Sequence, residues 1–369
     1  MRDARAHESG PIFSRLSEQR ENHLAGDSEI KFVRGTDRCR INRAARHVLV
    51  VRTFSPVLRC RVYQALDFAE QERAAIILAG GEGSRLRSLT RRIMGCEVPK
   101  QFCPVIGEQT LLEQTLQRVT IGTDMRLMSV VLTRAHESFY SSIVRDVPER
   151  NVVVQPQNRG TAPAILYSLL RLAKVAPKAR VAIFPSDHFV DNNHKFMRHV
   201  DMAFAVVGNR PELTVLLGIK PEWAETDYGW IEPALAVRNT STFQVGRFWE
   251  KPEPELAKEL FVRGCLWNSF VMVAQLSTLL SLIIVALPKL YLSFKKIQPL
   301  LGTTLETEAV ERLYNSLPSA SFSDEVLVRH PVNLAVLPVH DVEWSDLGEP
   351  QRVMQTLSRV RVRPGWATA

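Results

Sequence analysis

Residues 74–87 read Ala74-Ala75-Ile76-Ile77-Leu78-Ala79-Gly80-Gly81-Glu82-Gly83-Ser84-Arg85-Leu86-Arg87, and Val98-Pro99-Lys100-Gln101-Phe102 follows soon after. The stretch begins with an uncharged apolar run, which predicts a strand buried on both faces, as in a parallel sheet covered by helices. Three glycines within four positions come next, and they let the backbone approach a ligand with no Cβ in the way. Because successive amide N–H groups can then converge on phosphate oxygens, the stretch predicts an anion-binding loop at the end of a buried strand.

The glycine spacing fits neither of the two commonest nucleotide-binding loops. The phosphate loop of the NTPases requires Gly, four residues and then Gly-Lys-Ser/Thr, and the dinucleotide loop requires a third glycine three residues after the second. Taken alone, the loop is equally consistent with a tight strand-to-helix turn. Arg85 and Lys100 flank it, however, and two cations suit a triphosphate whose charge must be neutralised during phosphoryl chemistry.

The motif Gly80-Gly81-x-Gly83-Ser84-Arg85-Leu86, with Pro99-Lys100 downstream, resembles the signature of the sugar-1-phosphate nucleotidyltransferases. The Lys100-Gln101-Phe102 variant resembles the mannose-1-phosphate guanylyltransferases within that family. The resemblance covers about residues 74–360, and six separated motifs occur in family order. It implies that the nucleotide is bound by Gly80, Gly81, Gly83, Ser84, Arg85 and Lys100.

A second nucleotide-binding segment is expected at Gln155-Pro156-Gln157-Asn158-Arg159-Gly160-Thr161-Ala162-Pro163-Ala164. Amide and hydroxyl groups there can face the edge of a base, and the N-terminus of the following helix favours a nearby phosphate. A capped loop with no ligand is the alternative. The segment resembles the family motif that lies against the base, which adds Gln155, Asn158, Arg159 and Thr161 to the nucleotide site. Its Asn-Arg-Gly-Thr order differs from the more frequent Gly-Arg-Asn-Thr.

Two carboxylates are candidates for a metal site. Asp187 directly follows an apolar strand, so its side chain should lie at the carboxyl edge of the sheet, where ligands bind in open α/β folds. Pro185-Ser186-Asp187-His188 resembles the family's Pro-x-Asp-His motif, whose Asp binds the metal, and no role is assigned to His188. Trp344-Ser345-Asp346-Leu347-Gly348 resembles a further family motif, which makes Asp346 the second ligand of one Mg²⁺ ion. A helix cap and a surface turn are the alternatives.

A sugar-phosphate site is implied by three segments between these carboxylates. By resemblance Glu250 and Asn268 bind sugar hydroxyls, Gly229 lets the ring approach the backbone, and Lys251 binds the sugar phosphate. Asp227 stands where the family usually has Gly, and Ser269-Phe270-Val271-Met272 stands where it has Ser-Gly-Met-Phe. The implied catalytic residues are Arg85, Lys100, Asp187 and Lys251.

The chain from Ala74 onward alternates strands with helices. Strands are expected over residues 128–132, 151–154, 181–184 and 213–218, and helices over 110–119 and 161–175, where apolar residues recur at helical spacing. Antiparallel strands are expected at 228–231, 243–249 and 269–273, with a surface helix at 253–262. The prediction is a Rossmann-like α/β fold with a mostly parallel sheet flanked by helices and a smaller antiparallel, sugar-binding portion, as in glycosyltransferase-A-like nucleotidyltransferases.

We expect the chain to divide into three parts. Residues 1–72 show no sustained periodicity and are interpreted as a mobile extension or a misassigned start, with a regulatory arm as the alternative. Residues 73–360 form the catalytic domain, and 361–369 a tail. No cupin-like isomerase segment or hexapeptide repeat follows Val360, so a single function is expected.

Composition limits the classes of molecule that this chain is expected to bind. The net charge of +8 comes without a dense basic block, which argues against nucleic acid and suits phosphorylated small-molecule substrates. The five cysteines are widely spaced, which predicts reduced thiols and a cytoplasmic location. Residues 266–287 carry no charge and are long enough to span a bilayer, but they are interpreted as a strand (270–274) and a buried helix. No membrane association is expected, and a homodimer stays open.

The resemblance implies an enzyme that converts a nucleoside triphosphate and a sugar 1-phosphate into a nucleotide sugar and pyrophosphate. GTP and mannose 1-phosphate, giving GDP-mannose, are the expected pair, with Mg²⁺ as cofactor. Thymidylyl or uridylyl transfer to glucose 1-phosphate is one alternative. A non-catalytic nucleotide-sugar sensor is the other.

Overall fold

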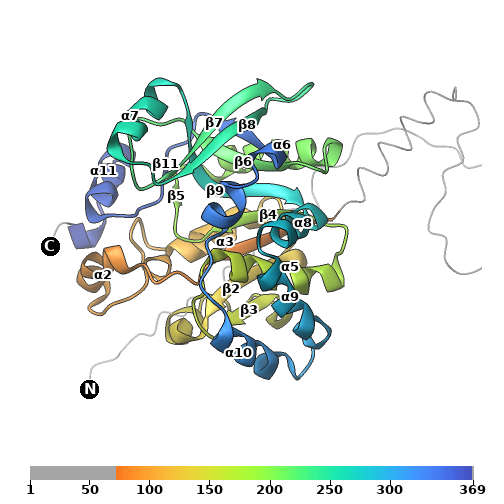
Figure 1. Cartoon of the computed structure of the whole chain (residues 1–369). Coiled ribbons are helices and arrows are strands. Elements are labelled where there is room, and N and C mark those ends of the chain that lie inside the picture. The colour runs from red at the N-terminus through yellow and green to blue at the C-terminus, as the bar shows by residue number, and fades with distance from the viewer. Residues whose placement is uncertain (1–71, 368–369) are drawn as a thin grey trace, which may run out of the picture. The chain divides into compact units, whose positions relative to one another are not determined.

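The computed structural model describes residues 72–367 (Figure 1). The predicted extension over residues 1–72 therefore lies almost wholly outside the described residues, and the three-part division of the chain stays a prediction. In the described chain, Val362 and Trp366 of the expected tail pack against a buried cluster that contains Leu357.

One mixed sheet of nine strands forms the centre of this region (Figure 1). Its order is β3-β2-β1-β4-β9-β6-β10-β8-β7. β1 pairs in parallel with β2 and β4, and β2 in parallel with β3, whereas β9 runs antiparallel to both β4 and β6. The strands span Arg73–Leu78 (β1), Met128–Thr133 (β2), Val152–Gln155 (β3), Arg180–Pro185 (β4), Thr214–Ile219 (β6), Gly229–Ala236 (β7), Phe243–Glu250 (β8), Leu266–Gln275 (β9) and Leu334–Val339 (β10). A separate two-stranded pairing joins β5 (Phe189–Val190) to β11 (Trp344–Ser345).

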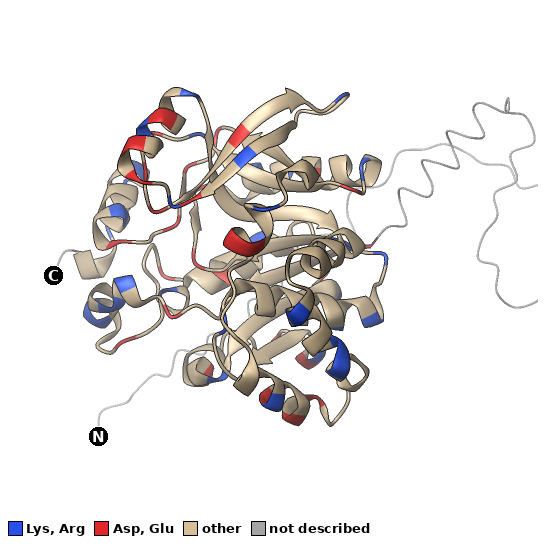
Figure 2. Cartoon of the chain, viewed as in Figure 1, with Lys and Arg blue, Asp and Glu red and all other residues tan. Residues whose placement is uncertain are grey.

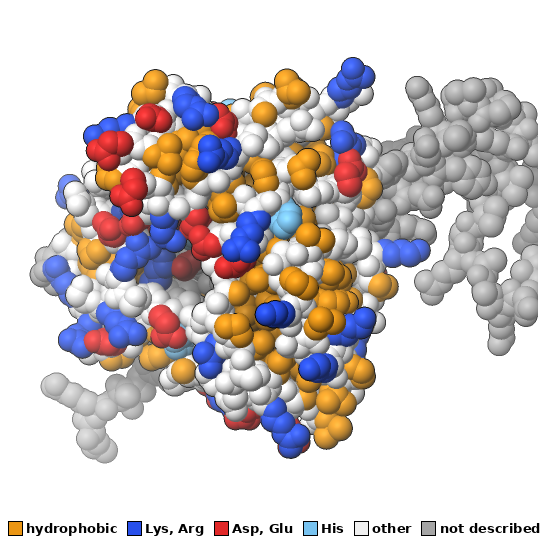
Figure 3. Space-filling view, in the orientation of Figure 1, with side chains coloured by type: hydrophobic (Ala, Val, Ile, Leu, Met, Phe, Trp, Pro, Cys, Tyr) orange, Lys and Arg blue, Asp and Glu red, His pale blue; other side chains and the backbone are white. Residues whose placement is uncertain are grey.

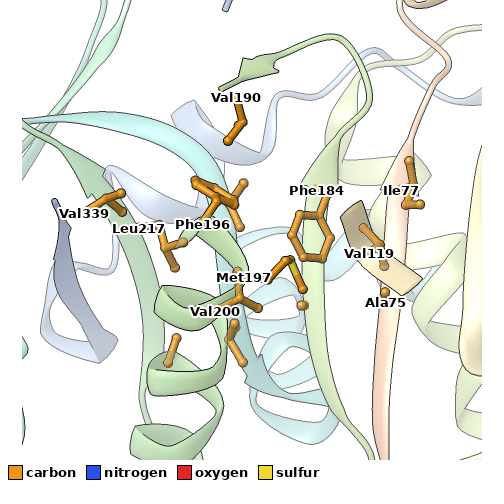
Figure 4. Packing of buried hydrophobic residues seen from close by; sticks show 14 of the residues in the cluster. Ala75, Ile77, Val119, Phe184, Val190, Phe196, Met197, Val200, Leu217 and Val339 are labelled. Atoms are coloured by element: carbon orange, nitrogen blue, oxygen red, sulfur yellow. The ribbon is translucent and has the colours of Figure 1, made fainter. Parts of the chain in front are cut away.

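Helices cover both faces of the sheet. Because successive side chains of a strand point to opposite faces, β1 contributes Ala75 and Ile77 to one core and Ala74 and Ile76 to the other. Figure 4 shows the first core, where Phe196, Met197 and Val200 of α6 pack beside Phe184 of β4. The second core lies beneath α5, α8, α9 and α10. The helices span Arg87–Met94 (α2), Leu111–Thr120 (α3), Glu137–Tyr140 (α4), Thr161–Val175 (α5), Asn193–Asn209 (α6), Pro254–Val262 (α7), Leu276–Ala286 (α8), Pro288–Ile297 (α9), Glu306–Ser316 (α10) and Pro350–Val360 (α11).

The predicted α/β fold class is confirmed, and so are most of the predicted elements. α3 begins after Thr110, whose hydroxyl accepts from the Glu113 amide while the Glu113 carboxylate accepts from the Thr110 amide, a capping box that satisfies two free donors. The antiparallel portion continues the parallel portion within the same sheet. Charged residues belong mainly to the helices and loops around the sheet (Figure 2).

The uncharged run over 266–287 forms β9 and the following helix α8, as expected. No single helix within residues 72–367 has the length and hydropathy of a membrane span. α8 meets that test only together with residues Pro288–Leu300, from which it is bent by 119°.

Candidate active site

A cavity of about 330 Å³ lies where β1, β3 and β4 end. Its lining includes six of the predicted site residues, which are Gly80, Gly81, Gln155, Asn158, Thr161 and Asp187. The carboxyl ends of parallel strands meet at one edge of a sheet, which is why segments far apart in sequence line one cavity. Figure 3 shows a hollow beside α2 with basic and acidic side chains at its rim.

The glycine loop has no room for side chains at two of its three glycines. A Cβ on Gly80 would lie 2.9 Å from both Gln155 Nε2 and Thr133 Oγ1. Gly83 has a φ of +58°, and a Cβ there would lie 2.8 Å from the Lys100 amide nitrogen. A Cβ on Gly81, by contrast, would have no neighbouring atom within 4 Å, so this part of the loop is open for a ligand.

Gln101 is hydrogen-bonded to the backbone of the glycine loop. Its Nε2 donates to the carbonyl oxygens of Ala79 (3.1 Å) and Gly81 (2.7 Å). The sequence motif contains Gln101, but no role follows for it from the sequence alone. Ser84 begins the short 3₁₀ helix Ser84–Leu86 (η3) and is exposed.

The second segment is anchored from α10. Tyr314 donates from its hydroxyl to Gln155 Oε1 at 3.0 Å, and the backbone oxygen of Tyr314 accepts from Arg159 Nε at 3.2 Å. Thr161 accepts from the Phe322 amide through its hydroxyl, and Asn158 accepts from the Gly160 amide. The four predicted residues run from the end of β3 to the start of α5, with Gln155, Asn158 and Thr161 at the cavity and Arg159 bonded to the supporting helix.

Lys100 connects the two predicted metal-binding segments. Its Nζ lies 3.1 Å from Asp187 Oδ2 and donates to the backbone oxygen of Asp346 at 2.5 Å. Burial raises the pKa of Asp187, but the Lys100 ammonium and His188 outweigh that effect, so the pKa lies below its ordinary value. The charge of Asp346 acts in the opposite direction, which places the two carboxylates within electrostatic reach of each other.

The carboxylate of Asp346 has three donors on one oxygen. Tyr228 Oη (2.8 Å), the Gly348 amide (2.8 Å) and Arg352 Nη1 (2.7 Å) all bond Oδ1. Burial raises the pKa of Asp346, but the charges of Lys100 and Arg352 lower it by more than burial raises it. The pKa therefore lies below its ordinary value, and the group is ionised at neutral pH. The position of the carboxylate is therefore determined by the fold before any ligand binds.

Arg352, on α11, is a site residue that the sequence did not reveal. Its side chain is 8% exposed, and Nη2 also lies 2.9 Å from Glu225 Oε2. Its guanidinium lies 4.7 Å from the centre of the Tyr228 ring. An arginine on the face of an amphipathic helix usually points to solvent, so nothing in the local pattern distinguishes Arg352.

The predicted sugar-site residues meet around Gly229. A Cβ on Gly229 would lie 2.9 Å from Glu250 Oε2 and 3.2 Å from Asn268 Cβ, so these two side chains converge over its Cα. Lys251 donates to Glu250 Oε1 at 2.8 Å, and Asn268 Oδ1 accepts from the Phe270 amide. Arg85 Nη1 bonds Asp227 Oδ2 in the loop before Gly229.

Three residues near the site have a left-handed backbone without being glycine. They are Lys251 (φ 48°), Phe270 (φ 60°) and Leu347 (φ 48°). Such conformations cost free energy and persist where the surrounding structure over-determines them, and they cluster at functional sites. Phe270 also lines the cavity.

The donor set is compatible with a magnesium ion. Within residues 72–367 no group of three or more His, Cys, Asp or Glu side chains gathers as a complete metal cage. Mg²⁺ does not need one, because it commonly takes one or two carboxylates and completes its shell with phosphate oxygens and water. Asp187 and Oδ2 of Asp346 are the oxygens that could serve.

Comparison with known proteins gives a consistent result. The family model described as "Nucleotidyl transferase" matches residues 74–361. Mannose-1-phosphate guanylyltransferase 2 of Escherichia coli O157:H7 is 29% identical over 289 residues, which are 75% of this chain and 58% of that protein. The alginate biosynthesis protein AlgA of Pseudomonas syringae pv. tomato is 33% identical over 199 residues, or 53% of this chain and 40% of that protein. The matched region is thus 58% of the first relative and 40% of the second, so the chain spans only about half the length of these curated relatives.

A solved structure supports the fold. The crystal structure described as mannose-1-phosphate geranyltransferase from Thermus thermophilus matches with a TM-score of 0.67 at 23% identity and covers 80% of each chain. At that identity the likeness concerns the fold alone. The family resemblance expected from the sequence is confirmed by the match over residues 74–361.

Proposed function

The chain belongs to the nucleotidyl transferase family, and we propose that it transfers a nucleotidyl group from a nucleoside triphosphate to a sugar 1-phosphate. The observation that carries the proposal is the position of Lys100. This lysine of the signature motif contacts both Asp187 and Asp346 beside the cavity that the glycine loop lines. A cation and two carboxylates at an anion-binding loop suit phosphoryl chemistry, in which charge neutralisation and positioning supply most of the catalysis.

In the reaction a sugar-phosphate oxygen forms a bond to the α-phosphorus. The bond from that phosphorus to the oxygen bridging to the β-phosphate breaks in line, and pyrophosphate leaves. Arg85 and Lys100 hold the leaving phosphates, together with backbone amides of the loop over Gly80, Gly81, Gly83 and Ser84. Lys251 holds the phosphate of the nucleophile, and holding both substrates in line lowers the entropic part of the barrier.

The base lies against the segment of Gln155, Asn158, Arg159 and Thr161. Glu250 and Asn268 bind sugar hydroxyls beside Gly229, where the absence of a side chain leaves room for these two side chains to converge. Asp187 and Asp346 would hold a Mg²⁺ ion, which would supply neutralisation of the charge on the α-phosphate.

GTP and mannose 1-phosphate are the proposed pair, giving GDP-mannose and pyrophosphate. The name of the E. coli relative supports this choice, and the resemblance of the Lys100-Gln101-Phe102 variant points to the same pair. Thymidylyl or uridylyl transfer to glucose 1-phosphate stays the alternative within the same chemistry. A cytoplasmic location, small-molecule partners without nucleic acid or membrane, and a homodimer stay predictions.

Pyrophosphate release tests the proposal. The full chain is incubated with Mg²⁺ and each of four nucleoside triphosphates, paired in turn with mannose 1-phosphate and glucose 1-phosphate. The expected result is fastest release from GTP with mannose 1-phosphate. Turnover with none of the pairs would overturn the proposed function, and nucleotide-sugar binding without turnover would favour a sensor.

A further inference from the structure

Arg85, the arginine of the signature motif, is engaged by a side chain on the sugar side of the site. Its Nη1 donates to Asp227 Oδ2 at 2.7 Å. A Cβ built on Gly348 would lie 3.2 Å from Arg85 Nη2, so the guanidinium extends over the Trp344–Gly348 motif. Arg85 is not one of the described residues that line the cavity beside the glycine loop.

Asp227 is held in place to receive this arginine. Its amide donates to Glu225 Oε1 at 3.0 Å, and its Oδ2 lies 3.7 Å from Arg352 Nη2. Arg352 in turn bonds Glu225 and Asp346. The loop that carries Asp227 is thus fastened to the buried network, whereas Arg85 itself is 51% exposed and extends from a short 3₁₀ helix.

We propose that Asp227 is a latch that competes with the triphosphate for Arg85. The inference rests on the proposed function, because it takes a nucleoside triphosphate as the ligand. An ion pair between partly exposed side chains, here 51% for Arg85 and 31% for Asp227, is weak, and phosphate oxygens bind arginine more strongly through two parallel hydrogen bonds. When the triphosphate binds, its phosphates therefore replace Asp227 as the partner of Arg85. Breaking the Arg85–Asp227 ion pair costs free energy, which lowers the apparent affinity for the nucleotide.

A double-mutant cycle tests the latch. The dissociation constant for GTP is measured by calorimetry with Mg²⁺ and no sugar phosphate for the parent, Asp227→Asn, Arg85→Gln and the double variant. Asp227→Asn should tighten binding about two- to fivefold, the range expected for loss of an exposed competing pair. Arg85→Gln should weaken binding. In the Arg85→Gln background, Asp227→Asn should change nothing.

Inorganic tripolyphosphate serves as a second probe without a base, and Asp227→Asn should tighten its binding as well. Glu212→Gln is the matched control, since it removes another surface carboxylate paired with arginine, 2.5 Å from Arg210 and outside the site. Melting temperatures of all variants show that they are folded.

Three other results of the binding measurements would overturn the latch. Equal tightening in both backgrounds would indicate general charge repulsion by Asp227, and weaker binding would indicate that Asp227 orients Arg85 for the ligand. An unchanged constant would exclude competition. If the parent binds GTP but releases no pyrophosphate in the substrate panel, the proposed function fails while the latch stands. A parent that binds neither GTP nor tripolyphosphate would overturn both.

Discussion

Lys100 and Asp346 are 246 residues apart in the sequence and are joined by a 2.5 Å hydrogen bond from Nζ to the backbone oxygen. The same ammonium lies 3.1 Å from Asp187 Oδ2. A single signature lysine thus sets the distance between two motifs that each contribute a carboxylate. Because Lys100 is itself buried, its charge requires these oxygens as partners.

The two carboxylates should differ in what their loss does to the fold. Asp187→Asn and Asp346→Asn should each lower kcat by on the order of a hundredfold or more if both bind one magnesium ion, and the two losses should not add. Asp346→Asn should in addition lower the free energy of unfolding by about 3 kcal/mol, because it leaves the buried Arg352 without its main anionic partner. Asp187→Asn should lower stability less than Asp346→Asn, because Asp187 is 30% exposed and Lys100 keeps the backbone oxygen of Asp346 as an acceptor.

Steady-state kinetics over a range of Mg²⁺ and thermal melts of both variants are the measurements. Additive losses in kcat, or a near-normal rate at saturating Mg²⁺ for either variant, would contradict a shared ion. Equal melting temperatures would contradict the structural part of the prediction.

Arg352→Met should destabilise the protein far more than Arg359→Met on the same helix. Arg352 is 8% exposed and bonds two carboxylates, so its removal leaves Asp346 and Glu225 without the cation that is hydrogen-bonded to both, at a cost of about 3–5 kcal/mol. Arg359 is 37% exposed, and its pairs with Glu222 and Glu343 should contribute about 1 kcal/mol or less. Urea unfolding measures both values, and similar losses would show that the Arg352 network is not a buried one.

The glycine loop offers a matched pair of substitutions. Gly83→Ala should cost about 1–2 kcal/mol for a left-handed backbone, and its Cβ would also displace the Lys100 amide nitrogen, which would lie at 2.8 Å. Gly81→Ala meets no protein atom within 4 Å, so the melting temperature should be unchanged. Its Cβ would face the cavity, and triphosphate affinity should fall by at least about tenfold through lost bonds to a charged ligand. Calorimetry and melts separate the two effects, and a normal affinity in folded Gly81→Ala would place the phosphates elsewhere.

Stability should decline as the pH falls below neutrality, in part through His199. Burial lowers the pKa of His199 below its ordinary value, and His340 and Arg198 act in the same direction. Nε2 of His199 accepts from the His340 amide at 3.2 Å, which only the neutral ring can do. The unfolded chain therefore takes up this proton first, and the contribution of His199 is complete above about pH 6.5 and is lost as the pH falls toward the folded pKa.

Urea midpoints at pH 7.5 and pH 5.5 measure this dependence. The drop between the two should be smaller in His199→Gln than in the parent. An equal drop in both would assign the pH dependence to other groups.

The three cysteines of the described chain should react with iodoacetamide in a fixed order. Burial raises the pKa of Cys103 to about 12, with Cys96 adding to the effect, and burial also raises the pKa of Cys265. Because the thiolate is the nucleophile, exposed Cys96 should be alkylated first at pH 8. Peptide mass spectrometry at successive times gives the order, and unfolding in urea should remove it. Equal rates for Cys96 and Cys103 in the folded protein would contradict the burial of Cys103.

Much of the fold is encoded in short-range patterns of the sequence. The bounds of α5 agree with the expectation, and those of α3 differ by one residue, because apolar spacing and capping depend on neighbours within a few positions. The same holds for the uncharged run that forms β9 and α8. The strand β10 and the helix α6 were not expected, although both carry apolar residues at suitable spacing.

The sequence by itself determined the family, the fold class and the candidate residues, because each motif is a local arrangement that needs a particular residue type at a particular place. Only the tertiary structure decided which of them meet. The insertion of β9 between β4 and β6 depends on how the whole chain buries its apolar faces, and no local pattern specifies that pairing. The same packing brings Arg352 of α11 to Glu225, 127 residues away, and Asp227 to Arg85, 142 residues away. Side chains that are ordinary surface residues in the sequence thereby become partners of the site. For Arg352 and Glu225, which are 8% and 11% exposed, burial also removes the water that would otherwise separate their charges.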